Sequence, residues 1–462
     1  MFVLVGAICH IGSITSAAQV ESQAVFEQRM SKMFVAGDVP GAGVRVAING
    51  KVVYDKAFGI ANVETKIPAK TSMPFEIGSL SKQFTSVSAL MLVQDKRLSL
   101  SETIGSIIPG LPESWKSATI DQIMHHMSGI PDYEAIATYD FYNAKRTNAE
   151  VIAQAAKQEP EFKPGDKFDY SNTGYYLISM VIEKRSGMNM SQFLRRRIFD
   201  KLGMRSTYAD PPTSKPMTGY HSRTGNRMAQ PPIAWSSTLG AGGIVSTLDD
   251  LMKWDEALYS EKLLKKELLN KIWSPTKLND GTESAYGYGW FETRFRGIKE
   301  LDHSGQTNGF TCLYRRYPEQ HCSVWTFANT YEGDVVFGMS RLALSQYLTV
   351  LNYALIPIPN DPDPDRTKRH IGLIALVANG GDDLSALAPS MKNLATDAQF
   401  ETRRKQIKTL MAVSDSYRFV RKVNNGSEIE DFLYRQTNPD GDKYWNLRFN
   451  KGLLVRLTVE NQ

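Results

Sequence analysis

The chain has 462 residues, of which 42% are hydrophobic and 22% charged. This length exceeds what one modest core usually organises, so we expect two domains. The net charge of +5 is spread along the chain, and short basic clusters such as residues 195–197 fall on an expected helix face. This distribution excludes the concentrated basic footprint of a nucleic-acid-binding protein, and no nucleic-acid partner is expected.

The N-terminal stretch is typical of an export signal. Residues 1–18 carry no Asp, Glu, Lys or Arg, are hydrophobic from residue 2 to 14, and end in Ser16-Ala17-Ala18. Small residues in that place fit a signal-peptidase site, so we expect a signal peptide and a periplasmic or extracellular protein. The basic residue that usually opens such a leader is missing, which leaves a short anchor as the alternative. No later stretch has the roughly 18 apolar residues that span a bilayer, so no stable membrane span is expected after leader removal.

Strand patterns occur at both ends of residues 19–355, and helix patterns occur between them. Residues 43–48 and 51–54 flank Asn49-Gly50, a strong hairpin signal. Further strands are predicted at 287–291, 300–303, 309–314 and 323–328. Helices are predicted at 23–34, after Ser79, and at 120–124, 175–186, 190–202, 249–258 and 332–351. This order predicts an α+β domain, in which an antiparallel sheet is flanked by helices and carries a helical insert.

Two segments are expected to lack regular structure. Residues 208–237 are polar and Pro-rich, which predicts a long loop. Residues 356–369 are rich in Pro and Asp, which predicts a stiff linker. Beyond it, residues 370–462 should form a small α+β accessory domain that is helical at first, although 371–377 fits a strand as well. Its end predicts an antiparallel meander of segments 432–436, 444–449 and 453–459.

The cysteines and the paired histidines do not indicate a metal site. Cys312 and Cys322 flank a predicted hairpin turn, and both a cross-strand disulfide and two free buried thiols fit this placement. His125 and His126 are adjacent, so their side chains point to different faces, and no His-Glu-x-x-His motif accompanies them. We therefore expect neither a metal nor another cofactor.

Ser79 and Lys82 are candidates for a nucleophile and its base. They stand three residues apart at the start of an apolar helix, where their Cβ atoms would lie about 5–6 Å apart on one face. A lysine can accept the serine proton only when it is neutral, and burial lowers its pKa toward that condition. Alone, Ser-x-x-Lys is a weak pattern, because a helix cap followed by a solvated lysine looks the same.

Two further segments offer the other groups that acyl transfer needs. Tyr170 and Asn172 lie two residues apart in a predicted loop before a helix, so both can face one cleft. His303-Ser304-Gly305 ends a predicted strand, where the glycine permits a substrate to approach the backbone closely.

These three motifs, in this order and with separations near 90 and 130 residues, resemble those of the serine β-lactamase and penicillin-binding protein superfamily. The tyrosine of the second motif is similar to that of class C β-lactamases, D-alanyl-D-alanine carboxypeptidases, D-aminopeptidases and related esterases. Segments 76–82, 126–131 and 242–246 also resemble family segments. The resemblance covers roughly residues 20–355 and implies a β-lactamase/transpeptidase-like fold for them.

The resemblance implies a role for each motif residue. Ser79 would be the acylated nucleophile and Lys82 its proton acceptor. Tyr170 would share the proton traffic, poised by the lysine or by His303. Asn172 would hydrogen-bond the substrate amide or the lysine.

The third motif would bind the substrate. The backbone N–H of Gln306, which follows Gly305, would form the oxyanion hole together with that of the nucleophile. Where β-lactamases carry Lys-Thr-Gly, this chain has His303, which is mostly neutral at pH 7 when unperturbed. Loss of the fixed cation favours a peptidase or esterase over a true β-lactamase, unless Arg315 or Arg316 restores the charge.

The resemblance therefore implies a serine hydrolase that forms an acyl-enzyme on D-amino-acid peptides or amides, esters or β-lactams. The expected partner is a small molecule or short peptide, such as a cell-wall fragment. The alternative is a catalytically idle penicillin-binding sensor or scaffold.

Overall fold

The computed structural model describes residues 22–210, 216–223, 226–296, 298–331, 333–352, 358–424, 428–437 and 442–461. The chain divides into two compact units, one spanning Phe26–Tyr347 and the other including Leu348–Gln462. The expected signal peptide at 1–18 lies outside the described residues. Within them, no helix combines the length and the apolar character that crossing a bilayer requires.

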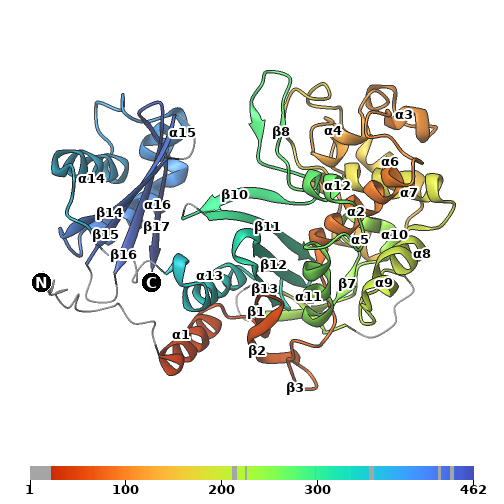
Figure 1. Ribbon diagram of the computed structural model, residues 1–462, viewed down its shortest axis with the longest axis horizontal. Coiled ribbons are helices and arrows are strands. Elements are labelled where there is room, and N and C mark those ends of the chain that lie inside the picture. The colour runs from red at the N-terminus through yellow and green to blue at the C-terminus, as the bar shows by residue number, and fades with distance from the viewer. Residues whose placement is uncertain are drawn as a thin grey trace, which may run out of the picture. The chain divides into compact units, whose positions relative to one another are not determined.

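A seven-stranded antiparallel sheet forms the centre of the larger unit (Figure 1). Early and late parts of the chain meet in it, because Val46 of β1 stands opposite both Tyr54 of β2 and Val324 of β13. The strand order is β10 (Phe291–Phe295), β11 (Ile298–Thr307), β12 (Phe310–Tyr317), β13 (Cys322–Ala328), β1 (Gly41–Ile48), β2 (Lys51–Asn62) and β3 (Ile67–Pro68).

The insert is the part of the chain between strands β3 and β10. Helices lie before the sheet, within this insert and after the last strand. They are α1 (Gln23–Ala36), α2 (Ser81–Gln94), α3 (Ile104–Ile107), α4 (Ile120–Met124), α5 (Tyr139–Asn143), α6 (Asn148–Ala155), α7 (Asn172–Ser186), α8 (Met190–Leu194), α9 (Asp200–Leu202), α10 (Trp235–Thr238), α11 (Leu248–Ala257), α12 (Lys266–Lys271) and α13 (Val335–Tyr347). Short strand pairs within the insert are β4 (Phe75–Glu76) with β7 (Val245–Ser246), β5 (Gly219–Arg223) with β6 (Asn226–Gln230), and β8 (Thr276–Lys277) with β9 (Glu283–Ser284).

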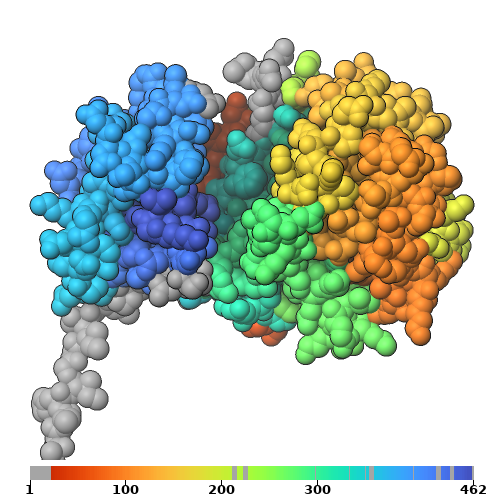
Figure 2. Space-filling model, turned by 90° about the horizontal axis from the view of Figure 1, so that it is seen from above, coloured from red at the N-terminus to blue at the C-terminus, as the bar shows by residue number. Residues whose placement is uncertain are grey.

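Different helices cover the two faces of the sheet. Because successive side chains of a strand point to opposite faces, neighbouring residues of β2 contact different helices. Tyr54 packs against Phe26 of α1 and Tyr347 of α13 on one face. The next residue, Asp55, and its cross-strand partner Arg45 point to the other face, which the insert covers (Figure 1). The insert, coloured orange to green in Figure 2, forms one continuous surface.

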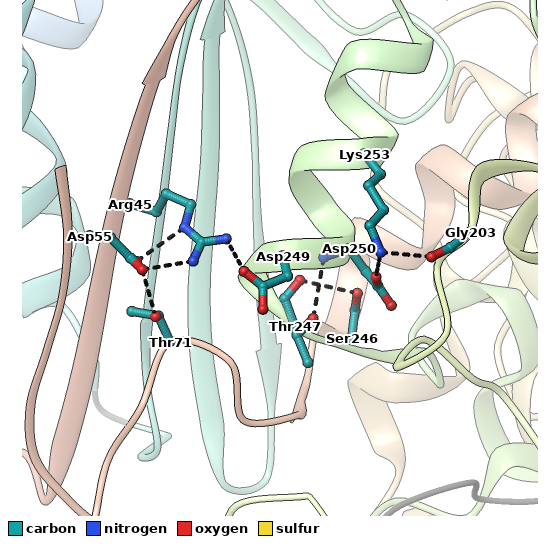
Figure 3. Close-up of polar contacts among 9 residues, drawn as sticks. All are labelled: Arg45, Asp55, Thr71, Gly203, Ser246, Thr247, Asp249, Asp250 and Lys253. Carbon is teal, nitrogen blue, oxygen red and sulfur yellow. Dashed lines mark hydrogen bonds and ion pairs between the residues drawn. The ribbon is translucent and has the colours of Figure 1, made fainter. Parts of the chain in front are cut away.

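Arg45 ties the sheet to the insert (Figure 3). Its guanidinium donates to both carboxylate oxygens of Asp55, at 3.1 and 2.8 Å, and to Asp249 of α11 at 2.6 Å. The Arg45 side chain is 6% exposed and that of Asp249 is 51% exposed. The sheet end of this contact is therefore shielded from water, whereas its α11 end is solvated.

Helix α2, which follows Ser79 and carries Lys82, lies in the centre of the insert. Phe84 stacks on Trp254 of α11 with ring centroids 4.1 Å apart, and the adjacent Gln83 accepts a hydrogen bond from the Trp254 indole at 3.1 Å. Ser86, on another side of the helix, lies 3.2 Å from the Tyr175 hydroxyl of α7. Packing on several sides holds the start of α2 in a fixed position.

Two expectations for the larger unit differ from the structure, and the open question of the cysteines is decided in favour of free thiols. The strand expected at 287–291 begins only at Phe291, because Gly289, at φ +83°, makes a turn whose backbone lies against Gln83. Residues 208–237, expected to be irregular, contain β5, β6 and α10. Cys312 stands opposite Phe327 in the β12–β13 register, and both cysteines are free and buried.

The smaller unit is a four-stranded antiparallel sheet packed with three helices. The strands follow chain order as β14 (Tyr417–Asn424), β15 (Ile429–Gln436), β16 (Lys443–Asn450) and β17 (Leu453–Asn461), and the helices are α14 (Pro364–Asn379), α15 (Pro389–Thr396) and α16 (Glu401–Met411). Helix α14 begins inside the expected linker, where Asp363 caps it by accepting from the Arg366 N–H at 2.9 Å. Residues 371–377 are therefore helical, and β14 is a strand that the sequence pattern did not indicate. The predicted α+β class, with its insert and its C-terminal meander, is confirmed.

Candidate active site

Two glycines bring the nucleophile segment against β11. Ser79 lies in a 3-10 turn, Gly78–Leu80, directly before α2. Gly78 has φ +50°, and a Cβ there would lie 2.6 Å from the backbone nitrogen of Gln306. A Cβ on Gly305 would collide with the carbonyl oxygen of Ile77. Glycine at both positions therefore permits the backbone of the nucleophile turn to contact the strand.

Lys82 is fully buried and has three polar neighbours. Its Nζ lies 3.0 Å from Ser79 Oγ, 2.6 Å from Asn172 Oδ1 and 2.8 Å from the Ala241 carbonyl oxygen. Burial lowers the pKa of Lys82 to about 8, against the opposing pull of nearby carboxylates. A minor fraction of the amine, about one tenth at pH 7, is therefore neutral and can act as a base, and this fraction grows as the pH rises toward 8.

Tyr170 lies beside this pair and is held by a histidine. Its ring centroid is 4.8 Å from Lys82 Nζ. Burial raises the pKa of the Tyr170 phenol well above its usual value, with the Ser79 hydroxyl acting in the opposite direction. His126 lies against the Tyr170 ring at 4.1 Å and accepts from the Ser171 N–H at 3.1 Å. Within the described residues, no three His, Cys, Asp or Glu side chains gather as metal ligands would.

His303 is neutral and bonded to a partner that sequence reasoning missed. Its Nδ1 lies 2.6 Å from the Ser304 carbonyl oxygen, which can only accept, so Nδ1 carries the proton. Its Nε2 therefore accepts from the Tyr286 hydroxyl at 3.1 Å. Burial and the charge of Lys82 lower the pKa of His303 to about 3. The rings of His303 and Tyr170 are 6.0 Å apart, and the histidine bonds Tyr286 rather than the Tyr170 phenol.

Three motif residues are placed differently from what was expected. Asn172 is the first residue of α7 and not part of a loop. His303 and Gly305 lie within β11, which continues to Thr307. Strand β10 pairs only with residues 298–302 of β11. The following residues line the cleft, so the substrate side of this strand is open where a substrate backbone can pair with it.

Motif residues Ser79, Tyr170, Asn172 and His303 line one cleft of about 800 Å³, and the buried Lys82 contacts it through Ser79. Its wall includes Ser79, Glu134, Tyr139, Tyr142, Tyr170, Asn172, His303, Gln306 and Tyr331. Neither Arg315 nor Arg316 contributes to this wall. Arg315 donates to Ser340 Oγ at 2.7 Å, and Arg316 pairs with Asp255 at 3.0 Å. The alternative that Arg315 or Arg316 restores the charge of the missing lysine is therefore not supported.

Two carboxylates near Lys82 were not singled out from the sequence. Glu134 lines the cleft, and burial together with the neighbouring Asp132 raises its pKa to about 7. Asp132 Oδ2 accepts from Asn172 Nδ2 at 3.0 Å. Asp132 and Glu134 lie within three residues after segment 126–131. The resemblance of that segment to family segments is the sequence signal that could have pointed to these carboxylates.

Comparisons with known proteins agree with this geometry. The β-lactamase family model matches residues 23–348. Penicillin-binding protein 4* of Bacillus subtilis is 28% identical over 325 residues, which cover 66% of this chain and 71% of that protein. A D-aminopeptidase of Gluconobacter oxydans is 29% identical over 334 residues, 70% of this chain, and this chain spans only 60% of that protein's length.

Solved structures show the same fold. The octameric penicillin-binding protein homologue from Pyrococcus abyssi superposes with a TM-score of 0.63 at 21% identity, covering 95% of this chain and 100% of that one. The D-amino acid amidase from Ochrobactrum anthropi, in complex with L-phenylalanine amide, gives a TM-score of 0.61 at 24% identity and covers 71% and 98%. Together with the family match, these relatives support a hydrolase. The chain belongs to the β-lactamase family.

Proposed function

We propose that this protein is a serine hydrolase that forms an acyl-enzyme on Ser79. The observation that carries the proposal is the contact of 3.0 Å between the Ser79 hydroxyl and the Lys82 amine, whose pKa burial lowers to about 8. A nucleophile beside a partly neutral base, on the wall of an open cleft, is the arrangement that covalent acyl transfer requires.

In the first step, Ser79 Oγ attacks the substrate carbonyl and its proton passes to Lys82. The backbone N–H groups of Ser79 and Gln306 stabilise the oxyanion. As the bond to the leaving group breaks, Tyr170 relays the proton from the lysine to the departing nitrogen or oxygen. Water then attacks the ester by the reverse proton path, which releases the acid and restores the serine.

We propose amides and short peptides of D-amino acids, with esters as further substrates. Glu134 offers a carboxylate on the cleft wall, and such a group suits the α-ammonium of an aminoacyl substrate. The relatives named D-aminopeptidase and D-amino acid amidase support the same class. The neutral His303 provides no cation for a substrate carboxylate. Efficient β-lactam hydrolysis is therefore disfavoured.

A substrate panel tests this proposal. Wild type and Ser79→Ala would be compared on D-alanine p-nitroanilide, its L-enantiomer, its N-acetyl form, p-nitrophenyl acetate and nitrocefin. We expect Ser79-dependent turnover of the ester and of the D-anilide, with slower turnover of the L- and N-acetyl forms. Turnover that survives Ser79→Ala would refute the nucleophile. A stable Ser79 adduct with a β-lactam, without turnover of any substrate, would instead establish the penicillin-binding sensor.

A further inference from the structure

The proposed base raises a question of orientation. A neutral lysine amine has two N–H groups and one lone pair, and it accepts the serine proton only if the lone pair faces the hydroxyl. Rotation about the last side-chain bond places any of the three directions toward Ser79. Something in the site must therefore select the productive rotamer.

Two acceptors take the two N–H groups of Lys82. The Asn172 amide oxygen lies 2.6 Å and the Ala241 carbonyl oxygen 2.8 Å from Nζ. With both N–H groups donated, the third direction, toward the hydroxyl 3.0 Å away, holds the lone pair. The Ala241 carbonyl is backbone and can only accept. The Asn172 side chain, by contrast, could present either its oxygen or its NH₂.

Asp132 removes this ambiguity. Its carboxylate only accepts, and its Oδ2 lies 3.0 Å from Asn172 Nδ2, so the amide must direct its NH₂ group to Asp132 and its oxygen to the lysine. We infer that Asp132 is a positioning residue, which turns the oxygen of the Asn172 amide toward Lys82 and so leaves the amine lone pair to the nucleophile. This inference rests on the proposed function.

Asp132 is itself held in place. Its Oδ1 accepts from the Glu134 N–H at 3.1 Å, and its backbone carbonyl accepts from Gln158 Nε2 at 2.9 Å. The next residue, Tyr133, donates its N–H to Thr173 Oγ1 of α7 at 2.9 Å. These contacts fix the carboxylate relative to the helix that carries Asn172. The orientation of the amide is therefore set by a rigid support.

The charge of Asp132 gives the inference a second readout. The titratable groups around Lys82 are Asp132, Glu134, His126, His303, Tyr170 and Tyr175. Burial keeps the histidines neutral and the phenols protonated near pH 8, so the two carboxylates are the charged neighbours. Each raises the pKa of Lys82. Loss of the Asp132 charge should thus shift the lysine titration to lower pH.

The test is a double-mutant cycle on the acylation rate with p-nitrophenyl acetate, an ester that lacks an amine. Asp132→Ala should slow acylation by about tenfold to a hundredfold, part of the roughly 10²–10⁴ that a positioned base contributes. In an Asn172→Ala background the same change should have almost no further effect, because the amide it orients is gone.

Asp132→Asn keeps an acceptor for Asn172, so it should recover part of the rate and move the acid limb of the pH profile downward. Glu113→Ala, which removes an exposed carboxylate, is the matched control and should behave as wild type.

The outcomes separate this inference from the proposed function. Equal losses from Asp132→Ala with and without Asn172, or a wild-type rate in Asp132→Ala, would overturn the positioning role. If Asp132→Ala does not fold, the same cycle is run with Asp132→Asn. Absence of Ser79-dependent turnover in wild type would refute the hydrolase alone. In that case ¹³C NMR titration of Lys82 decides the positioning role. A pKa change on Asp132→Ala that is larger in the wild-type than in the Asn172→Ala background supports it, because the direct effect of the carboxylate charge is common to both backgrounds, and equal changes contradict it.

Discussion

The two walls of the cleft differ in charge. The insert carries the buried Lys82 amine in contact with Ser79 of the cleft wall, with Asp132 and Glu134 close enough to affect its titration. The wall built by β11 carries a neutral His303 and the backbone of Gln306. In the proposed mechanism this difference assigns proton transfer to the insert, whereas the sheet would bind substrate through uncharged groups. A substrate that fits this cleft should thus bring a cation to the insert wall rather than an anion to the sheet wall.

The largest test of this contrast removes the base from the insert wall. Lys82→Arg keeps a cation of similar length but cannot deprotonate in the accessible pH range. We expect ester turnover to fall by about 10³-fold, within the range for loss of a general base. Burst kinetics with p-nitrophenyl acetate would measure it, and circular dichroism would check the fold. Acylation at the wild-type rate would show that the base lies elsewhere.

The second test follows the protonation of the same amine. Below its pKa of about 8, Lys82 is mostly protonated and cannot accept the serine proton, so raising the pH should raise the rate. Ester turnover should fall about tenfold for each pH unit below that value and level off above it. A profile of initial rates from pH 5.5 to 9.5 measures this limb. A flat profile between pH 6 and 8 would contradict a neutral-lysine mechanism.

The third test concerns the cation site proposed for the insert wall. Glu134→Gln preserves shape and removes the charge, so kcat/KM for D-alanine p-nitroanilide should fall about tenfold to a hundredfold, the value of a hydrogen bond between charged groups. The N-acetyl anilide, which has no ammonium, is the control and should be affected little. Equal losses on both substrates would show that Glu134 serves the chemistry rather than recognition.

The fourth test gives the sheet wall the charge that it lacks. His303→Lys should raise kcat/KM for a carboxylate-bearing β-lactam relative to p-nitrophenyl acetate by about fivefold, the effect of one partly solvated ion pair. Nitrocefin and the ester, measured in the same preparations, provide the ratio. An unchanged ratio would mean that the sheet wall does not meet the substrate carboxylate.

The sequence predicted the insert wall better than the sheet wall for a physical reason. Ser79 and Lys82 lie within one turn of chain, so their contact follows from local helix geometry. The partner of His303 is Tyr286, whose position depends on the turn at Gly289 that shortened the expected strand. Tertiary packing of that turn against α2 overrides the local strand pattern.

The carboxylates were missed for a related reason. Asp132 follows a loop, and its contact with Asn172 spans 40 residues, so no periodic pattern connects them. The antiparallel sheet, in contrast, was predictable from alternating segments and from Asn49-Gly50, because hairpins are local. Strand β14 depends on packing within the smaller unit. The start of α14 does carry a local signal, because Asp363 caps the helix and Pro364 opens it, but the Pro- and Asp-rich composition favoured a linker there.

The smallest expected effect concerns the contact between Arg45 of the sheet and Asp249 of the insert. Asp249 binds Arg45 from α11 but is half exposed, so Asp249→Ala should lower the free energy of unfolding by only about 0.5–1 kcal/mol. The neighbouring Asp250 is the matched comparison, since it is buried and accepts from the Ser206 N–H at 2.7 Å and from Thr207 Oγ1 at 3.0 Å. Asp250→Ala should cost about 2–3 kcal/mol, because buried donors lose their acceptor.

Urea unfolding of both variants, followed by tryptophan fluorescence, measures this difference, and ester turnover should be unchanged in Asp249→Ala. The bidentate contact of Arg45 with Asp55 remains in that variant, so the guanidinium keeps its place on the sheet. A loss of turnover without a loss of stability would contradict this account, because it would mean that the solvated contact sets the spacing of the walls. Unchanged turnover together with unchanged stability would contradict the expected loss, because it would mean that the contact between Arg45 and Asp249 contributes nothing measurable.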